Sequence, residues 1–498
     1  MISSDLYGAG LLAALFGAGA YFLLTSNRSA LPDAGGLPAK GKKYRYDLKP
    51  SSPPPSPPSP AAPRPAAAKK RRPPRPVPSL RCLDVGRLEL ARSNVFGART
   101  YKGLRAECEA LPPARAWRDD EFKHDSSSMF ESGCAPEGWL RDGERGRVLR
   151  DVRVVWEGPW AVCGSGRPLG RNTRGEPSWL FHAKEGEEDL MDAEDVQQGS
   201  LGDCYFLTAL ALVSTDTECT ASLIDESLEQ HGCYGVSFFL DGTWQMVYVD
   251  GFFPCYVSTK PHSVVKPRPC FASSGNRREI WPMVVEKAFA KLHGCWESIG
   301  RGGLIGVALQ ALTGGASTTL ETKGGGEALW PLLMEAVEDP NVLVGAGTKA
   351  SLGEAESMGV VCGHAYSVIH AVSVLGHKLL LLRNPWGHGE WKGDWSDGSK
   401  LWSENPEVAA AVGDGRSTED DGRFWMSMED FVRVFQSVDA CRLPGDGHHQ
   451  THDAGLHRRD SGGGGGGGTG QSGGDKKEIA QHHKKDKKHK AHKKKKHK

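Results

Sequence analysis

Residues 197–213 read QQGSLGDCYFLTALALV, and this stretch decides the fold of the chain. A polar turn with two glycines is followed from Tyr205 by the Ala and Leu density of a buried helix. Cys204 lies at the junction, where unpaired N–H groups and the positive end of the helix dipole favour the thiolate form. Gln198 lies six residues earlier and can donate an amide N–H to the oxygen of an attacked carbonyl. The stretch alone is equally compatible with a buried structural cysteine.

The composition limits the class of protein. A chain of 498 residues has room for two or three domains, but 15 of its 31 prolines lie in residues 27–80, so the folded part is smaller than the length suggests. The 12 cysteines form no CxxC pairs and no Cys/His clusters with zinc spacing. This usage excludes a disulfide scaffold and indicates reduced thiols in an intracellular protein.

The N-terminal part is predicted to be an anchor followed by a tether. Residues 6–24 are uncharged and apolar, and at about 1.5 Å per residue they just span a hydrocarbon core. Basic residues follow them, so we expect a single-pass transmembrane segment with the body of the chain in the cytosol. A cleaved signal or targeting segment is the alternative, which would leave a cytoplasmic protein. Residues 27–80 are rich in Pro, Ser and Ala and are predicted to be a disordered linker.

The C-terminal part, residues 443–498, is predicted to be a second disordered tail. It contains seven consecutive glycines and ends in a run of Lys and His. Polyglycine is a flexible linker, and a polycation of this kind cannot bury a core. Such a tail can contact anionic lipid, nucleic acid or acidic proteins, and a nonspecific solubilising role is the alternative. We assign no metal site to its histidines.

The middle of the chain is predicted to fold as two lobes. Helical periodicity dominates residues 116–323, and strands dominate residues 324–442, with a glycine-rich hinge at 324–326. Within the first lobe, two β-rich runs around Asp241 and Gly242 predict a hairpin. A cleft between the lobes is therefore expected.

A cysteine nucleophile needs a base, and the base needs a group that fixes its orientation. The run GHAYSVIHAV (363–372) offers His364 and His370, and the room beside Gly363 favours His364. The strand LLLLRNP (379–385) ends in Asn384. A short turn at Gly376 between antiparallel strands is expected to bring His364 and Asn384 side by side, with Trp386 excluding water.

Six blocks then carry a family resemblance. QGSLGDCYFLTALALV, WPMVVEKAFAKLHGCWES, LTGG, GHAYSV, RNPWGHGEWKGDWSD and FWMSMEDF resemble, in order, the protease core of the calpains, peptidase family C2. The resemblance implies an α+β fold: a two-lobed papain-like core, helical around the cysteine and β-rich around histidine and asparagine. It implies that Cys204 is the nucleophile, His364 the acid and base, Asn384 the orienting residue and Gln198 the oxyanion-hole donor. Trp386 resembles the residue that shields the site.

The resemblance also implies calcium, with one ion in each lobe. The matching carboxylates belong to Asp195 and Glu286 in the first lobe and to Glu390, Asp397 and Asp421 in the second. Carboxylate oxygens suit calcium. Arg423 departs from the family pattern, because a cation replaces an acidic residue there and should weaken the second site. Tyr205 departs as well, at a position where the family mostly has Trp.

We expect no counterpart of the family's C-terminal regulatory parts in this sequence. No β-sandwich pattern follows Arg442, and no EF-hand loop motif occurs in the chain. The sequence therefore predicts a membrane-tethered, calcium-modulated cysteine endopeptidase acting on protein substrates. A noncatalytic membrane-tethered scaffold is the alternative. Transglutaminase-like acyl transfer is disfavoured by Asn384, because those enzymes usually have Asp as the third residue.

Overall fold

A computed structural model describes residues 86–112, 115–136, 152–182, 191–260, 266–413 and 419–444. The predicted anchor at 6–24, the linker at 27–80 and almost all of the tail at 443–498 lie outside these ranges. None of the helices in the described ranges is both long and apolar enough to cross a membrane.

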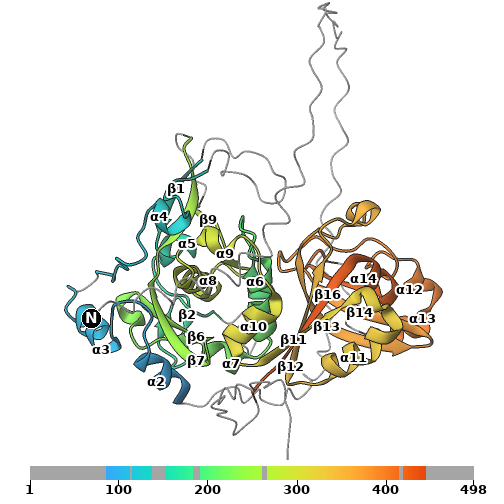
Figure 1. Cartoon of the computed structure of the whole chain (residues 1–498). Helices are drawn as coiled ribbons and strands as arrows, with labels where there is room; N and C mark the ends of the chain where they lie inside the picture. Colours follow the sequence, from blue (N-terminus) through green and yellow to red (C-terminus); the bar gives the residue numbers. More distant parts are fainter. Residues whose placement is uncertain are drawn as a thin grey trace, which may run out of the picture. The chain divides into compact units, whose positions relative to one another are not determined.

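The first lobe combines helices with small antiparallel sheets (Figure 1). Its helices are α4 (Ser126–Met129), α5 (Pro159–Val162), α6 (Cys204–Val213), α7 (Thr217–Ala221), α8 (Trp281–Leu292), α9 (Trp296–Ile299) and α10 (Ile305–Thr313). One three-stranded sheet has the order β5 (Ile224–Asp225), β6 (Cys233–Leu240), β7 (Thr243–Asp250), and a second has the order β1 (Val152–Glu157), β8 (Phe253–Ser258), β9 (Arg268–Pro269). The two-stranded pairs are β2 (Gly170–Arg171) with β3 (Pro177–Ser178), and β4 (Val196–Gln197) with β10 (Ser273–Ser274).

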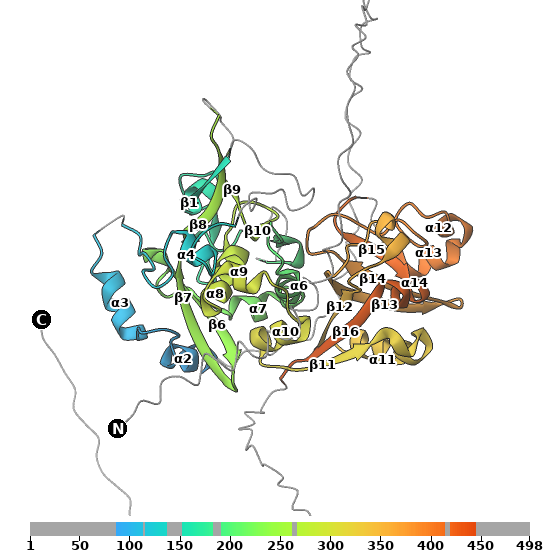
Figure 2. The same cartoon turned by 45° about the horizontal axis from the view of Figure 1, so that its top comes forward.

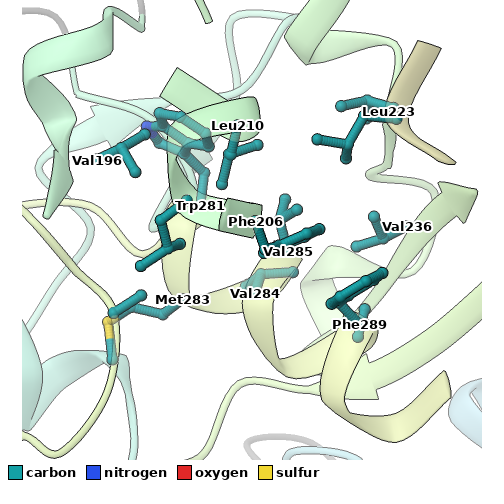
Figure 3. Packing of buried hydrophobic residues seen from close by; sticks show 14 of the residues in the cluster. Val196, Phe206, Leu210, Leu223, Val236, Trp281, Met283, Val284, Val285 and Phe289 are labelled. Carbon is teal, nitrogen blue, oxygen red and sulfur yellow. The ribbon is translucent and has the colours of Figure 1, made fainter. Parts of the chain in front are cut away.

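Helix α6 is the centre of this lobe because it has no polar face. Every residue from Tyr205 to Val213 is buried. The Phe206 ring stacks on Phe289 of α8 with the ring centroids 3.9 Å apart, and Figure 3 shows the apolar side chains that surround this pair. Burying one large apolar side chain contributes about 1.5–3 kcal/mol. The packing therefore fixes the start of α6, where Cys204 lies.

The hairpin predicted around Asp241 and Gly242 is confirmed. Strands β6 and β7 pair antiparallel from Leu240 opposite Thr243 onward. Asp241 and Gly242 have φ of 48° and 78°, the left-handed values that a tight two-residue turn needs. The periodicity of the sequence predicted a mainly helical lobe. It did not predict the other small sheets that the lobe contains.

The second lobe is built on one six-stranded antiparallel sheet (Figure 1). Its order is β11 (Ala316–Glu321), β16 (Phe435–Arg442), β12 (Val342–Thr348), β13 (Ala365–Val374), β14 (His377–Arg383), β15 (Arg423–Ser427). Its helices are α11 (Gly326–Glu338), α12 (Leu401–Glu404), α13 (Pro406–Val412) and α14 (Met428–Val434), and short 3-10 turns lie at Thr322–Gly324 and Gly353–Met358. The sheet presents His364 and Asn384 at the ends of neighbouring strands.

The chain enters the second sheet earlier than the predicted hinge at 324–326. Helix α10 ends at Thr313 and is capped by Gly314, whose φ of 70° is left-handed. A Cβ on Gly315 would lie 2.5 Å from the Arg442 carbonyl oxygen, so only glycine fits where the chain turns into β11. Strand β11 then pairs with β16 over its whole length. The sheet of the second lobe therefore begins at Ala316.

Two helices precede the two lobes and pack on the first of them. They are α2 (Gly86–Ser93) and α3 (Tyr101–Glu109), and Figure 2 shows them in blue beside β7. Leu104 and Cys108 are buried in a cluster with Met246 and Tyr248 of β7. The Arg87 guanidinium lies 3.4 Å from the centroid of the Trp244 ring and donates to the Leu312 carbonyl at 3.1 Å. This segment lies before the two predicted lobes and is part of the folded unit.

Candidate active site

Cys204 is the first residue of α6 and lies against the second lobe. Its side chain is partly exposed, and it forms a hydrogen bond with the backbone of Ala365 at the start of β13. Burial raises the pKa of the Cys204 thiol to about 11, and backbone hydrogen bonds at the helix start only partly offset this. The predicted shift toward thiolate is therefore wrong for this arrangement, because desolvation outweighs the effect of the helix terminus.

His364 and Asn384 meet at the open end of the β13–β14 hairpin. The turn consists of Leu375 and Gly376, with φ of 49° and 84°, and the two strands pair directly. His364 Nε2 and Asn384 Oδ1 are 2.9 Å apart, and both side chains are buried. Burial lowers the pKa of His364 to about 4 despite the hydrogen bond that its Nε2–H donates to Asn384. His370, the alternative base, lies instead against Trp425 with ring centroids 6.0 Å apart.

The Cys204 sulfur and the His364 imidazole belong to neighbouring segments but are not hydrogen-bonded to each other. Ala365, whose backbone is hydrogen-bonded to Cys204, is the residue after His364. Within the described residues, no hydrogen bond joins Cys204 to His364. With pKa values of about 11 and about 4, both groups are neutral near pH 7. The arrangement thus places a thiol beside a neutral imidazole that an asparagine holds.

The side-chain amide of Gln198 contacts the first lobe through its nitrogen and the second lobe through its oxygen. Its Nε2 donates to the Leu201 carbonyl at 2.5 Å and faces Asp203 Oδ1 at 3.5 Å. Its Oε1 accepts from the Trp386 indole N–H at 2.9 Å, and its backbone N–H donates to the Pro385 carbonyl at 3.2 Å. The predicted oxyanion donor is therefore held between its own loop and the strand end that carries Asn384.

Two arginines of the second lobe contact the loop that leads to Gln198. Buried Arg383 donates to the Val196 carbonyl at 3.2 Å, and burial followed by the charge of Arg423 lowers its pKa to about 10. Arg423 forms an ion pair with Glu194 of the first lobe. The cation that departs from the family pattern is thus directed at an acidic residue across the junction.

The structure does not bring Glu286 to Asp195. Glu286 accepts from the Ala272 N–H at 2.9 Å and from the Trp296 indole at 3.1 Å, and it is hydrogen-bonded to Asp203. Burial and the charge of Asp203 raise the pKa of Glu286 well above its usual value. Asp195 instead acts on Glu279, whose pKa is raised to about 8 by burial and then by the Asp195 charge. Glu286 is therefore paired with the carboxyl group of Asp203, the residue before Cys204.

The acidic residues predicted for the second lobe do influence one another. Asp397 is hydrogen-bonded to Glu390, and the charge of Asp421 acts on both. Burial, opposed by the Gly422 N–H and reinforced by the neighbouring acids, raises the pKa of Glu390 to about 7. Burial raises that of Asp397 to about 6, with Asp421 and Asp420 adding to the shift. A divalent cation would relieve this repulsion, so the donor chemistry fits calcium.

The geometry for a metal ion is not complete in either lobe. Among the described residues, no three His, Cys, Asp or Glu side chains are arranged so that they could hold an ion together. The carboxylates predicted for the second lobe are therefore chemically suited to calcium. Those predicted for the first lobe are suited to it only if Glu279 takes the place of Glu286 as the partner of Asp195.

Four residues at the site were not singled out from the sequence: Asp203, Glu279, Ala365 and Arg383. Asp203 and Ala365 are the immediate neighbours of Cys204 and His364, and this adjacency was a usable signal. Glu279 lies one residue before the apolar run that becomes α8, where nothing in the spacing distinguishes it from Glu286.

Comparison with known proteins adds a family and relatives. Residues 117–442 match the calpain family cysteine protease domain. The calpain-type cysteine protease ADL1 of Oryza sativa is 36% identical over 358 residues, 68% of this chain and 15% of that protein. The calpain-2 catalytic subunit of Mus musculus is 33% identical over 358 residues, 70% of this chain and 45% of that protein. Human calpain-9 is 30% identical over 370 residues, 72% of this chain and 46% of that protein. The chain thus spans less than half the length of these relatives.

Proposed function

The chain belongs to the calpain family of cysteine proteases, and from that premise we propose that it is an endopeptidase that hydrolyses peptide bonds in proteins. Cys204, His364 and Asn384 form its catalytic triad. The contact between the lobes is the observation that supports this most. Cys204 is hydrogen-bonded to the backbone of Ala365, the residue after His364, and the His364 imidazole lies 2.9 Å from Asn384 Oδ1. Family membership together with this convergence makes a hydrolase the best-supported function.

The proposed reaction begins with attack of the Cys204 sulfur on a peptide carbonyl carbon. The thiol proton passes to His364 as the carbon–sulfur bond forms, and the carbonyl oxygen becomes an oxyanion beside the Gln198 amide. His364 then gives that proton to the leaving amine as the carbon–nitrogen bond breaks. Water hydrolyses the acyl-enzyme and restores the thiol. Asn384 fixes the imidazole throughout, and the Trp386 ring, 4.8 Å from His364 between centroids, limits access of water.

Two features of the site must change before this reaction can proceed. The sulfur has to approach the imidazole, because no hydrogen bond joins them among the described residues. One N–H of Gln198 has to turn from Asp203 toward the substrate.

We include calcium modulation in the proposal. Glu390, Asp397 and Asp421 would hold an ion in the second lobe, and Asp195 with Glu279 supplies the converging carboxylates in the first. A bound ion would supply charge neutralisation and would bring backbone segments on either side of the junction into a fixed position. Arg423 places a cation beside the second-lobe acids, so we expect the second ion to bind with low affinity.

The flanking segments complete the proposal. Residues 6–24 would anchor the protein with its protease domain in the cytosol, and a cytoplasmic protein is the alternative. The basic end of the chain would contact anionic lipid, nucleic acid or acidic proteins. Substrates would be proteins with extended, unstructured segments.

Proteolysis by the full chain tests the catalytic proposal. Casein should be cleaved by the parent and by Cys134→Ala, which alters an exposed cysteine remote in sequence from the site. It should not be cleaved by Cys204→Ala. Equal cleavage by Cys204→Ala would reject the mechanism. In millimolar calcium, where the sulfur is proposed to reach the imidazole, a thiol-directed epoxide should modify Cys204 selectively, whereas a noncatalytic scaffold, the alternative, would show neither cleavage nor selective labelling.

A further inference from the structure

We propose that Trp386 is a positioning residue of the oxyanion hole, because its indole N–H determines which end of the Gln198 amide faces the substrate. This inference rests on the proposed function and deepens it. It gives the Trp386 side chain a second task that is separate from shielding the site from water.

The argument starts from the chemistry of a glutamine side chain. Its amide has an acceptor oxygen at one end and a donor nitrogen at the other, and a half-turn exchanges them. An oxyanion hole needs the nitrogen. In the wrong orientation Gln198 would present Oε1 to a developing negative charge. Something must therefore select the orientation.

Three contacts make the selection in this protein. The indole nitrogen is only a donor, so at 2.9 Å it can hold only Oε1. The Leu201 carbonyl is only an acceptor, so at 2.5 Å it can hold only Nε2. The second N–H of the amide faces Asp203 Oδ1 at 3.5 Å, too long for a strong bond. That weakly held N–H is the donor available to a substrate oxygen.

Trp386 also connects the Gln198 amide to two members of the triad, Asn384 and His364. The backbone N–H of Trp386 donates to Asn384 Oδ1 at 3.1 Å, the same oxygen that contacts His364. The Trp386 ring lies against His364. Gln198 belongs to the first lobe, and Trp386 belongs to the second. Docking of the lobes therefore sets the oxyanion donor and the base together.

The substitution Trp386→Phe separates positioning from shielding, because it keeps an aromatic ring beside His364 and removes the N–H. We expect kcat for a peptide substrate to fall about tenfold, as for loss of one hydrogen bond, while KM changes less than twofold. Affinity for a peptide aldehyde should fall by a similar factor, because its hemithioacetal places an oxygen in the same hole. Alkylation of Cys204 by iodoacetamide should keep its rate, since that reaction forms no oxyanion.

Two further variants make the result specific. Gln198→Ala should lower kcat about 10²- to 10³-fold, the usual effect of losing an oxyanion donor. Adding Trp386→Phe to Gln198→Ala should cost less than a further twofold, because the indole then has no amide to orient. Trp160→Phe is the matched control: it removes an indole that is 48% exposed in α5 and should match the parent.

The proposal is overturned if Trp386→Phe costs the same factor with and without Gln198. It is also overturned if Trp386→Phe slows alkylation as much as peptide cleavage. Either result would show that the indole acts by shielding alone and would leave the protease assignment intact. Retained cleavage by Cys204→Ala would be different, because it would remove the proposed function itself.

Discussion

The charge state of Cys204 leads to a direct prediction about how its reactivity depends on pH. Burial raises the pKa of this thiol to about 11 and lowers that of His364 to about 4, and no hydrogen bond joins the two among the described residues. The neutral thiol therefore predominates over the whole physiological range. Because only the thiolate attacks an alkylating reagent, the rate should follow the thiolate fraction.

The magnitude follows from the pKa of about 11. At pH 7 the thiolate fraction is about 10⁻⁴, and it rises about tenfold for each pH unit. Between pH 6 and pH 9 the alkylation rate of Cys204 should thus rise by about three orders of magnitude without a plateau. A thiolate–imidazolium pair would behave differently, with a nearly constant rate between about pH 5 and pH 8.

The measurement is alkylation of the full chain by iodoacetamide, quenched at intervals and quantified by mass spectrometry of the peptide that carries Cys204. Exposed Cys134 in the same digest reports on the reagent, and circular dichroism at each pH excludes unfolding. A plateau between pH 5 and pH 8 in calcium-free buffer would refute the neutral pair and the reasoning from burial.

Repeating the experiment in millimolar calcium tests the alignment of the lobes. If ions bring the sulfur to the imidazole, the rising profile should become a plateau. Identical profiles in chelator and in calcium would reject that role of calcium and would leave the triad assignment unaffected.

Four other predictions address the triad, the core and the charges. Asn384→Ala removes the hydrogen bond to His364 and should lower kcat about tenfold or more, measured on a peptide substrate with alkylation of Cys204 as the control for folding. Thr208→Val should raise the free energy of unfolding by about 1 kcal/mol in a denaturant titration, because the buried Thr208 hydroxyl has no hydrogen-bond partner among the described residues. Burial raises the pKa of Glu229 to about 7, so its stabilising contribution is complete below its unfolded pKa and is lost as pH rises through 7. Glu229→Gln should therefore stabilise the protein by on the order of 2 kcal/mol at pH 8 and by little at pH 5, and an equal effect at both values would contradict this. Arg423→Gln should tighten calcium binding a few-fold in calorimetry, because a cation beside the second-lobe acids is removed, and unchanged or weaker binding would argue against a site there.

The sequence predicted the part of the site that depends on strand pairing. A short turn at Gly376 between two apolar runs was enough to expect His364 and Asn384 at one end of a hairpin, and their atoms are 2.9 Å apart. The hairpin around Asp241 followed from the same logic. Local turn chemistry fixes register over short distances, so such contacts are readable from the chain itself.

Contacts that depend on packing between remote segments were not readable. Glu279 and Glu286 are seven residues apart near one helix, and only the fold shows that the first faces Asp195 and the second faces Asp203. The helix start at Cys204 predicted a thiolate, because a sequence shows the helix dipole but not the degree of burial. Strand β16 is last in the sequence, yet it lies inside the second sheet between β11 and β12, a position that no local pattern indicates.

The helices before the protease domain have a practical consequence for anyone who expresses it. Cutting the chain at residue 117, where the family similarity starts, would delete α2 and α3 and uncover Met246, Tyr248 and Leu228. It would also remove Arg92, leaving the carboxylate of buried Asp225 without its counter-ion. A recombinant version that starts before Gly86 should stay in solution at concentrations where the shorter one precipitates.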